Sequence, residues 1–160
     1  NNPMSTLKKG DKAPDFSLHS TNKDVVTLSD QKGKNVVLLF FPLAFTGVCT
    51  TEMCTVRDSM AFYNKADAEV FGISIDPVPS LIKFKEDQNL QFTLLSDSNR
   101  EAVRAYDAVY EDFAFGLKGV AKRSAFVIDK DGTIQYAEVL DNAGELPNFD
   151  AIQETLKSLS

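Results

Sequence analysis

KGKNVVLLFFP, residues 32–42, is the stretch that decides the fold. Its centre, Val36 to Phe41, is apolar at every position, and Lys32-Gly33-Lys34 and Pro42 stand on either side. A short, continuous apolar run between turn residues is typical of a strand that is buried on both faces. We therefore expect a central strand that ends at Pro42 and is followed by a loop up to Val48.

Strand-like and helix-like segments alternate on both sides of this run. A hairpin of two short strands is expected between Asp15 and Leu28, around the polar turn at 20–23. This order predicts an α/β fold: a single domain with a mixed central sheet flanked by helices and an N-terminal β-hairpin extension. A thioredoxin-like domain requires this order, and many other α/β folds also allow it. Fold class alone does not decide function. Further strands are expected at 70–75, 92–95, 125–128 and 134–139, and helices at 50–66, 79–88, 99–106 and 149–159.

The composition excludes several classes of protein. The 160 residues are 43% hydrophobic and 25% charged, which suits one globular domain. A net charge of -6 argues against nucleic acid and against an anionic membrane surface as partners. No apolar run approaches the roughly 20 residues that span a bilayer. The first twelve residues lack the apolar centre of a signal peptide, so we expect a cytoplasmic protein. Met4 resembles a native start, so the domain is expected at 4–160 and residues 1–3 as an expression remnant.

The two cysteines are Cys49 and Cys54, and they are too few for a disulfide framework. In a reducing compartment such thiols are catalytic, metal-binding or buried. A structural zinc site usually needs four Cys or His ligands, and His19 is the only histidine, so no metal is expected. We expect His19 to be a surface residue of the early hairpin rather than the base of a Cys–His pair.

Cys49 is placed for reactivity, since it lies where the loop after the buried strand passes into a helix. The unpaired N–H groups and the positive end of the helix dipole favour thiolate over thiol there. Thr46 precedes it by three residues, within reach of the sulfur or of a bound oxygen atom, and Pro42 can line the pocket without offering an N–H group. Arg123, just before the strand expected at 125–128, could supply a permanent positive charge, provided that the fold brings it close.

Pro42-x-x-x-Thr46-x-x-Cys49 resembles the signature of the peroxiredoxin family, and Arg123 before its strand resembles the arginine that completes that site. The resemblance implies a thiol-dependent peroxidase that reduces hydrogen peroxide and organic hydroperoxides. The Cys49 thiolate would attack the peroxide, form a sulfenic acid and need no cofactor. Further landmarks of the family are matched by Lys12-Ala13-Pro14-Asp15-Phe16 and Leu94-Leu95-Ser96-Asp97.

The active-site stretch, with Glu52, is closest to the one-cysteine AhpE-like branch, whereas Cys54 has the spacing of a resolving cysteine in the bacterioferritin-comigratory (PrxQ) branch. Five residues along a helix separate two Cα atoms by about 8–9 Å, and a disulfide rarely bridges more than about 7 Å. The helix would therefore have to unwind before Cys54 could resolve Cys49. The alternative is a core cysteine on the inner helix face near Met53. For Glu52, a favourable charge at the helix start and a role in orienting Arg123 both remain open.

The oxidised enzyme would need thioredoxin, a glutaredoxin-type protein or a small thiol as reductant, and the family resemblance suggests a homodimer. Phe45 and the aromatic residues Tyr110, Phe113 and Phe115 could line its interface or a pocket for organic hydroperoxides.

Two other functions remain open. A disulfide oxidoreductase is disfavoured because the spacing is C-x4-C and no Trp is present. A redox sensor or holdase would share the first oxidation step and differ only in turnover.

Overall fold

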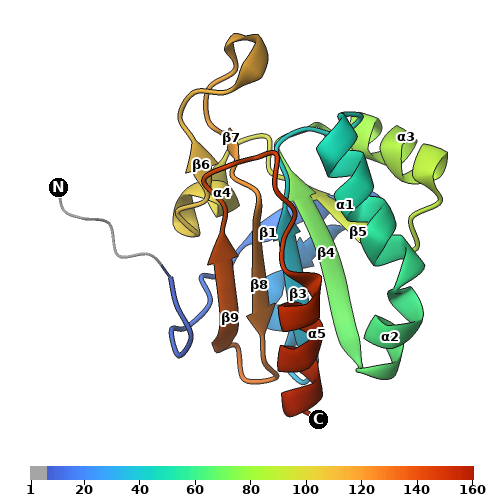
Figure 1. The fold of residues 1–160 in the computed structure, drawn as a ribbon, viewed down its shortest axis with the longest axis vertical. Coiled ribbons are helices and arrows are strands. Elements are labelled where there is room, and N and C mark those ends of the chain that lie inside the picture. Colours follow the sequence, from blue (N-terminus) through green and yellow to red (C-terminus); the bar gives the residue numbers. More distant parts are fainter. Residues whose placement is uncertain (1–6) are drawn as a thin grey trace, which may run out of the picture.

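The computed structural model describes residues 7–160, so the remnant expected at residues 1–3 lies outside the described residues. Within them, a seven-stranded mixed sheet has the order β2-β1-β5-β4-β3-β8-β9, and β6 and β7 pair separately (Figure 1). The strands are β1 Ser17–Ser20, β2 Val25–Thr27, β3 Asn35–Phe40, β4 Ala68–Ser74, β5 Thr93–Ser96, β6 Val109–Tyr110, β7 Val120–Ala121, β8 Ser124–Ile128 and β9 Ile134–Val139. The helices are α1 Gly47–Asp58, α2 Met60–Lys65, α3 Val78–Gln88, α4 Glu101–Ala105 and α5 Phe149–Ser158, with 3-10 turns at Leu28–Gln31 and Ala114–Gly116.

Strand β3 is the central strand that the sequence predicts, and all six of its residues are buried. Its side chains alternate between two apolar clusters, one on each face of the sheet. Val37 and Leu39 contact the cluster completed by α1, α2, α3 and α5. Leu38 and Phe40 contact the cluster completed by α4 and the segment before β1. Burial on both faces explains why this strand is apolar at every position from Val36 to Phe40.

The order of elements follows the prediction, with local differences. The helix expected at 50–66 begins earlier, at Gly47, and is interrupted at Ser59, where the backbone leaves helical geometry (φ -111°, ψ 10°). The expected hairpin is β1 with β2, and β1 also pairs with β5, so the hairpin extends the main sheet. The short pair β6 and β7, and the loop that extends from it in Figure 1, were not expected.

The topology determines which residues meet at one end of the sheet. β3 runs antiparallel to β8, and Phe40 at the end of β3 pairs with Ser124 at the start of β8. The loop that leads from β3 into α1 therefore lies beside the residue that precedes β8, which is Arg123. β4 runs parallel to β3, so its carboxyl end reaches the same edge. No helix among residues 7–160 is long and apolar enough to cross a membrane.

Candidate active site

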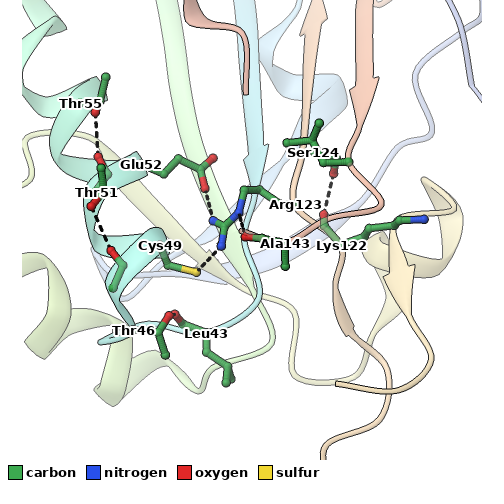
Figure 2. A network of polar contacts seen from close by, with 12 residues as sticks. Leu43, Thr46, Cys49, Thr51, Glu52, Thr55, Lys122, Arg123, Ser124 and Ala143 are labelled. Atoms are coloured by element: carbon green, nitrogen blue, oxygen red, sulfur yellow. Dashed lines mark hydrogen bonds and ion pairs between the residues drawn. The ribbon is translucent and has the colours of Figure 1, made fainter. Parts of the chain in front are cut away.

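Cys49 lies in the first turn of α1 and its side chain is buried, with 1% of its surface exposed. Its Sγ atom accepts a hydrogen bond from Nη2 of Arg123 at 3.2 Å (Figure 2). The first N–H groups of α1 have no partner within the helix, and the N–H of Thr50 is the first to bond back, to the carbonyl of Thr46. The sulfur is thus placed between a guanidinium and the positive end of a helix.

Arg123 is also buried, with 2% of its surface exposed, and each arm of its guanidinium has an acceptor. Nη1 donates to Oε1 of Glu52 at 2.6 Å, and Nε donates to the carbonyl of Ala143 at 2.9 Å. Burial opposes the charged form, but the Glu52 carboxylate and the Cys49 sulfur outweigh it and raise the pKa of Arg123 above its ordinary value. The guanidinium is held as a fixed cation against the sulfur.

Glu52 lies on α1 one turn after Cys49, fully buried, and points at Arg123 rather than at solvent (Figure 2). This contact agrees with the orienting role that the sequence left open. Burial raises the pKa of Glu52 to about 7, while the charge of Arg123 opposes the rise. Its second oxygen, Oε2, has no hydrogen-bond partner among the described residues. Glu52 is thus a buried carboxyl group with a raised pKa, held beside the cation that contacts Cys49.

The segment after β9 passes over Arg123 and completes the site, and it carries the Ala143 carbonyl (Figure 2). It is held at its start, where Leu140 donates its N–H to the carbonyl of Arg123 and accepts the hydroxyl of Tyr110 at 2.8 Å. Lys122 pairs with Asp141 at 2.6 Å. Sequence reasoning missed the part played by Ala143, because a backbone carbonyl leaves no signal in the residue type.

Thr46 and Pro42 lie in the loop between β3 and α1. The hydroxyl of Thr46 donates to the carbonyl of Leu43 at 2.7 Å, so its proton is directed at the loop rather than at the sulfur. The lone pairs of this oxygen remain as hydrogen-bond acceptors. Pro42 is buried directly after Phe41. Arg123 thus contacts Cys49 directly and Glu52 contacts Arg123, whereas Thr46 supports the loop beside them.

Cys54 is a free thiol on the same unbroken helix as Cys49. It is half-buried, and its Sγ atom lies 3.4 Å from Oε1 of Gln88, at the end of α3. It is absent from the apolar cluster that contains Met53 and Cys49, so the expected alternative of an inner-face core cysteine does not describe it. The geometric requirement for unwinding remains, because two residues five apart on a helix are too distant for a disulfide.

His19 lies exposed on β1, where it pairs with Val25 and Ser96, so it is the surface histidine that the sequence predicts. Among residues 7–160, no cluster of three or more His, Cys, Asp or Glu side chains is arranged to hold a metal ion.

Comparisons with known proteins agree with this geometry. The sequence profile of the AhpC/TSA family matches residues 9–137. Peroxiredoxin Bcp from Bacillus subtilis is 38% identical over 161 residues, which cover 97% of this chain and 98% of that protein. The crystal structure of peroxidoxin BcpB from Mycobacterium tuberculosis superposes with a TM-score of 0.84 at 29% identity, covering 96% of this chain and 99% of that one. A peroxiredoxin-like protein from Aquifex aeolicus gives a TM-score of 0.88 at 28% identity, covering 98% and 90%.

These likenesses extend over nearly the whole chain. They confirm the thioredoxin-like fold and the peroxiredoxin resemblance that the sequence predicts. The relatives include a Bcp peroxiredoxin, which agrees with the bacterioferritin-comigratory resemblance described for this sequence. The chain therefore belongs to the AhpC/TSA family and is a peroxiredoxin, an enzyme that reduces peroxides at the expense of thiols.

Proposed function

We propose that Cys49 is the peroxidatic residue and that it reduces hydrogen peroxide and organic hydroperoxides. The contact between Arg123 and the buried sulfur at the start of α1 is the observation that carries this assignment. The thiolate attacks the terminal oxygen of the hydroperoxide, so that an S–O bond forms and the O–O bond breaks. The sulfur becomes a sulfenic acid, and the other oxygen leaves with the electron pair and takes up a proton to give water or an alcohol.

The surrounding groups match the charge that moves during this step. Nη2 of Arg123 contacts the sulfur and is also placed to donate to the peroxide oxygen that the sulfur attacks. The unpaired N–H groups at the start of α1 supply further donors beside the same point. Because Thr46 gives its proton to Leu43, its oxygen acts as an acceptor for the O–H of the peroxide. Pro42 lines the pocket without adding a competing donor.

Glu52 acts through Arg123 as a positioning residue. Its Oε1 atom fixes Nη1 at 2.6 Å, which leaves Nη2 directed at the sulfur. Without this partner the buried guanidinium would destabilise the folded protein, because a charge that is removed from water needs an opposite charge close to it. The Ala143 carbonyl fixes Nε from the other side.

The sulfenic acid can return to the thiol by two routes. Cys54 can attack it and form a disulfide, provided that the first turns of α1 unwind and its contact with Gln88 breaks. An external thiol can otherwise reduce the sulfenic acid directly. In both cases the final electrons come from thioredoxin, a glutaredoxin-type protein or a small thiol, and we place this cycle in the cytoplasm, where such reductants are available.

We further propose a homodimer that packs near the active-site loops. Phe45, in the loop before α1, is 52% exposed, and Phe115, at the tip of the loop between β6 and β7, is 86% exposed. Phe45 holds a left-handed backbone conformation (φ 67°), and its ring packs edge-on against Phe84. A partner that packed against these loops would bury both side chains and remove their apolar surface from water.

Steady-state consumption of hydrogen peroxide with a thiol reductant tests the proposal. The wild-type protein should complete many cycles, and Cys49→Ser should complete none while keeping its fold. A single cycle that is followed by tight binding of another protein would instead identify a redox sensor. Reduction of insulin disulfides without peroxide consumption would identify a disulfide oxidoreductase.

A further inference from the structure

The loop from Phe41 to Thr46 carries two of the active-site residues, yet it belongs to no helix or strand. Phe45 within it has a left-handed backbone, which a non-glycine residue adopts only where its surroundings hold it there. One internal hydrogen bond, from Thr46 to the carbonyl of Leu43, closes the loop on itself. At the start of the loop, the N–H of Phe41 donates to the carbonyl of Ile73 in β4 at 2.9 Å, and a second anchor must hold the centre of the loop.

That anchor is the side chain of Asp76, which follows the carboxyl end of β4. Its Oδ2 atom accepts the backbone N–H of Ala44 at 2.9 Å. Ala44 is buried and stands midway between Pro42 and Thr46. The hydrogen bond therefore holds the centre of the loop. Ala44 directly follows Leu43, whose carbonyl accepts the hydroxyl of Thr46.

Asp76 is itself fixed on three sides. The hydroxyl of Ser74 donates to the same Oδ2 atom at 2.6 Å and accepts the N–H of Asp76 at 3.2 Å. The carbonyl of Asp76 accepts the hydroxyl of Ser96 at 2.7 Å. Ser74 and Ser96 are paired residues of the neighbouring parallel strands β4 and β5. The carboxylate is thus attached to the rigid central sheet.

We infer that Asp76 is a positioning residue for peroxide reduction: it ties the Thr46 loop to the end of β4 and so sets where the peroxide oxygen atoms are held. A carboxylate suits this task because its charge-assisted hydrogen bonds are shorter and stronger than neutral ones. The inference rests on the proposed role of Cys49, because it concerns the same step. It predicts that loss of Asp76 slows the reaction of Cys49 with peroxide more than its reaction with other electrophiles. A general loss of thiol reactivity would slow both reactions equally.

The test compares two reactions of Cys49 in the same protein. Attack on hydrogen peroxide needs the loop, whereas alkylation by iodoacetamide needs only the sulfur and its thiolate form. Asp76→Ala should lower the peroxide rate constant at least about tenfold while the alkylation rate changes less than about twofold. Asp76→Asn keeps an amide oxygen for the Ala44 N–H and should restore most of the rate. Ser74→Ala, which removes one support of the carboxylate, should give a smaller loss.

Glu154→Ala, at an exposed carboxylate on α5, is the matched control and should behave as wild type. Exchange of the Ala44 amide hydrogen reports on the tether without any peroxide chemistry. It should be protected in wild type and in Asp76→Asn and unprotected in Asp76→Ala. The wild-type peroxide rate tests the role of Cys49, and the ratio of the two rates in the variants tests Asp76. Equal losses in both reactions, an unchanged peroxide rate in Asp76→Ala, or a protected Ala44 amide in that variant would overturn the inference.

Discussion

Nη2 of Arg123 lies 3.2 Å from the sulfur of Cys49, although the two residues are 74 positions apart in the sequence. The antiparallel pairing of β3 with β8 brings them together, because Phe40 and Ser124 are opposite each other at the edge where the active-site loop begins. The sheet thus places a permanent cation beside the thiol. Four consequences of this arrangement can be measured.

Replacement of Arg123 should slow peroxide attack sharply. Loss of a donor that meets charge in a transition state typically costs about 100- to 1000-fold in rate. Arg123→Met should fall in this range. Arg123→Lys should recover only part of the rate, because an ammonium cannot serve Cys49, Glu52 and Ala143 in the fixed geometry of a guanidinium. Stopped-flow oxidation of the reduced protein measures the rate constant, and a full recovery in the lysine variant would contradict the geometric argument.

Glu52 should make the stability of the protein depend on pH between about 4.5 and 7. Burial raises the pKa of Glu52 to about 7 from its ordinary value of 4.5. The unfolded chain therefore ionises Glu52 before the folded protein does, and the stabilisation present below about 4.5 is lost as the pH rises to about 7. Relative to Glu52→Gln, the wild type should lose at most about 3 kcal/mol of unfolding free energy across this window.

Urea unfolding at pH 5 and pH 7 measures this loss, with the exposed residue Glu154, changed to Gln, as control. The difference between wild type and Glu52→Gln should shrink at pH 5. Identical pH slopes in these two proteins would show that Glu52 is already ionised in the folded state. Glu52→Ala should lower the peroxide rate more than Glu52→Gln does, because only glutamine can still accept from Arg123.

Cys54→Ser should separate the two recycling routes. If Cys54 resolves Cys49, the wild type forms an intramolecular disulfide after one equivalent of peroxide, and the variant accumulates sulfenic acid. The variant should then over-oxidise to sulfinic acid at lower peroxide concentrations. Intact mass spectrometry distinguishes these products. A stable sulfenic acid in the wild type would assign recycling to an external thiol alone.

A charge at Phe45 should weaken the proposed dimer. Phe45→Glu places a carboxylate in an exposed aromatic position that a partner would have to bury, and burial of an unpaired charge is costly. Sedimentation velocity should show a shift from dimer to monomer. Val25→Glu changes another exposed apolar residue, on β2, and serves as control. An unchanged monomer–dimer balance in Phe45→Glu would remove this residue from the interface.

The sequence predicts the framework better than the details, for physical reasons. The continuous apolar run of β3 has one stable placement, at the centre of the sheet, so its burial follows directly from its composition. The interruption at Ser59 leaves no comparable trace, because the apolar positions Met53, Val56, Met60 and Tyr63 keep helical spacing across it.

The site shows the same division. Pro42, Thr46 and Cys49 lie within eight residues of one another, so their spacing can be recognised from the sequence alone. The approach of Arg123 depends on strand register, and the parts played by Asp76 and Ala143 depend on a backbone N–H and a backbone carbonyl. Hydrogen bonds between a side chain and a backbone group depend on the folded backbone, so they cannot be predicted from the pattern of residue types.

Rapid mixing of the reduced protein with one equivalent of hydrogen peroxide tests the central claim most directly. After a fast quench, the intact mass and the modified residue are determined. Cys49 should react within the mixing time, and the protein should either gain one oxygen atom as a sulfenic acid or lose two hydrogen atoms as a Cys49–Cys54 disulfide. A folded protein in which Cys49 remains an unreacted thiol would contradict it.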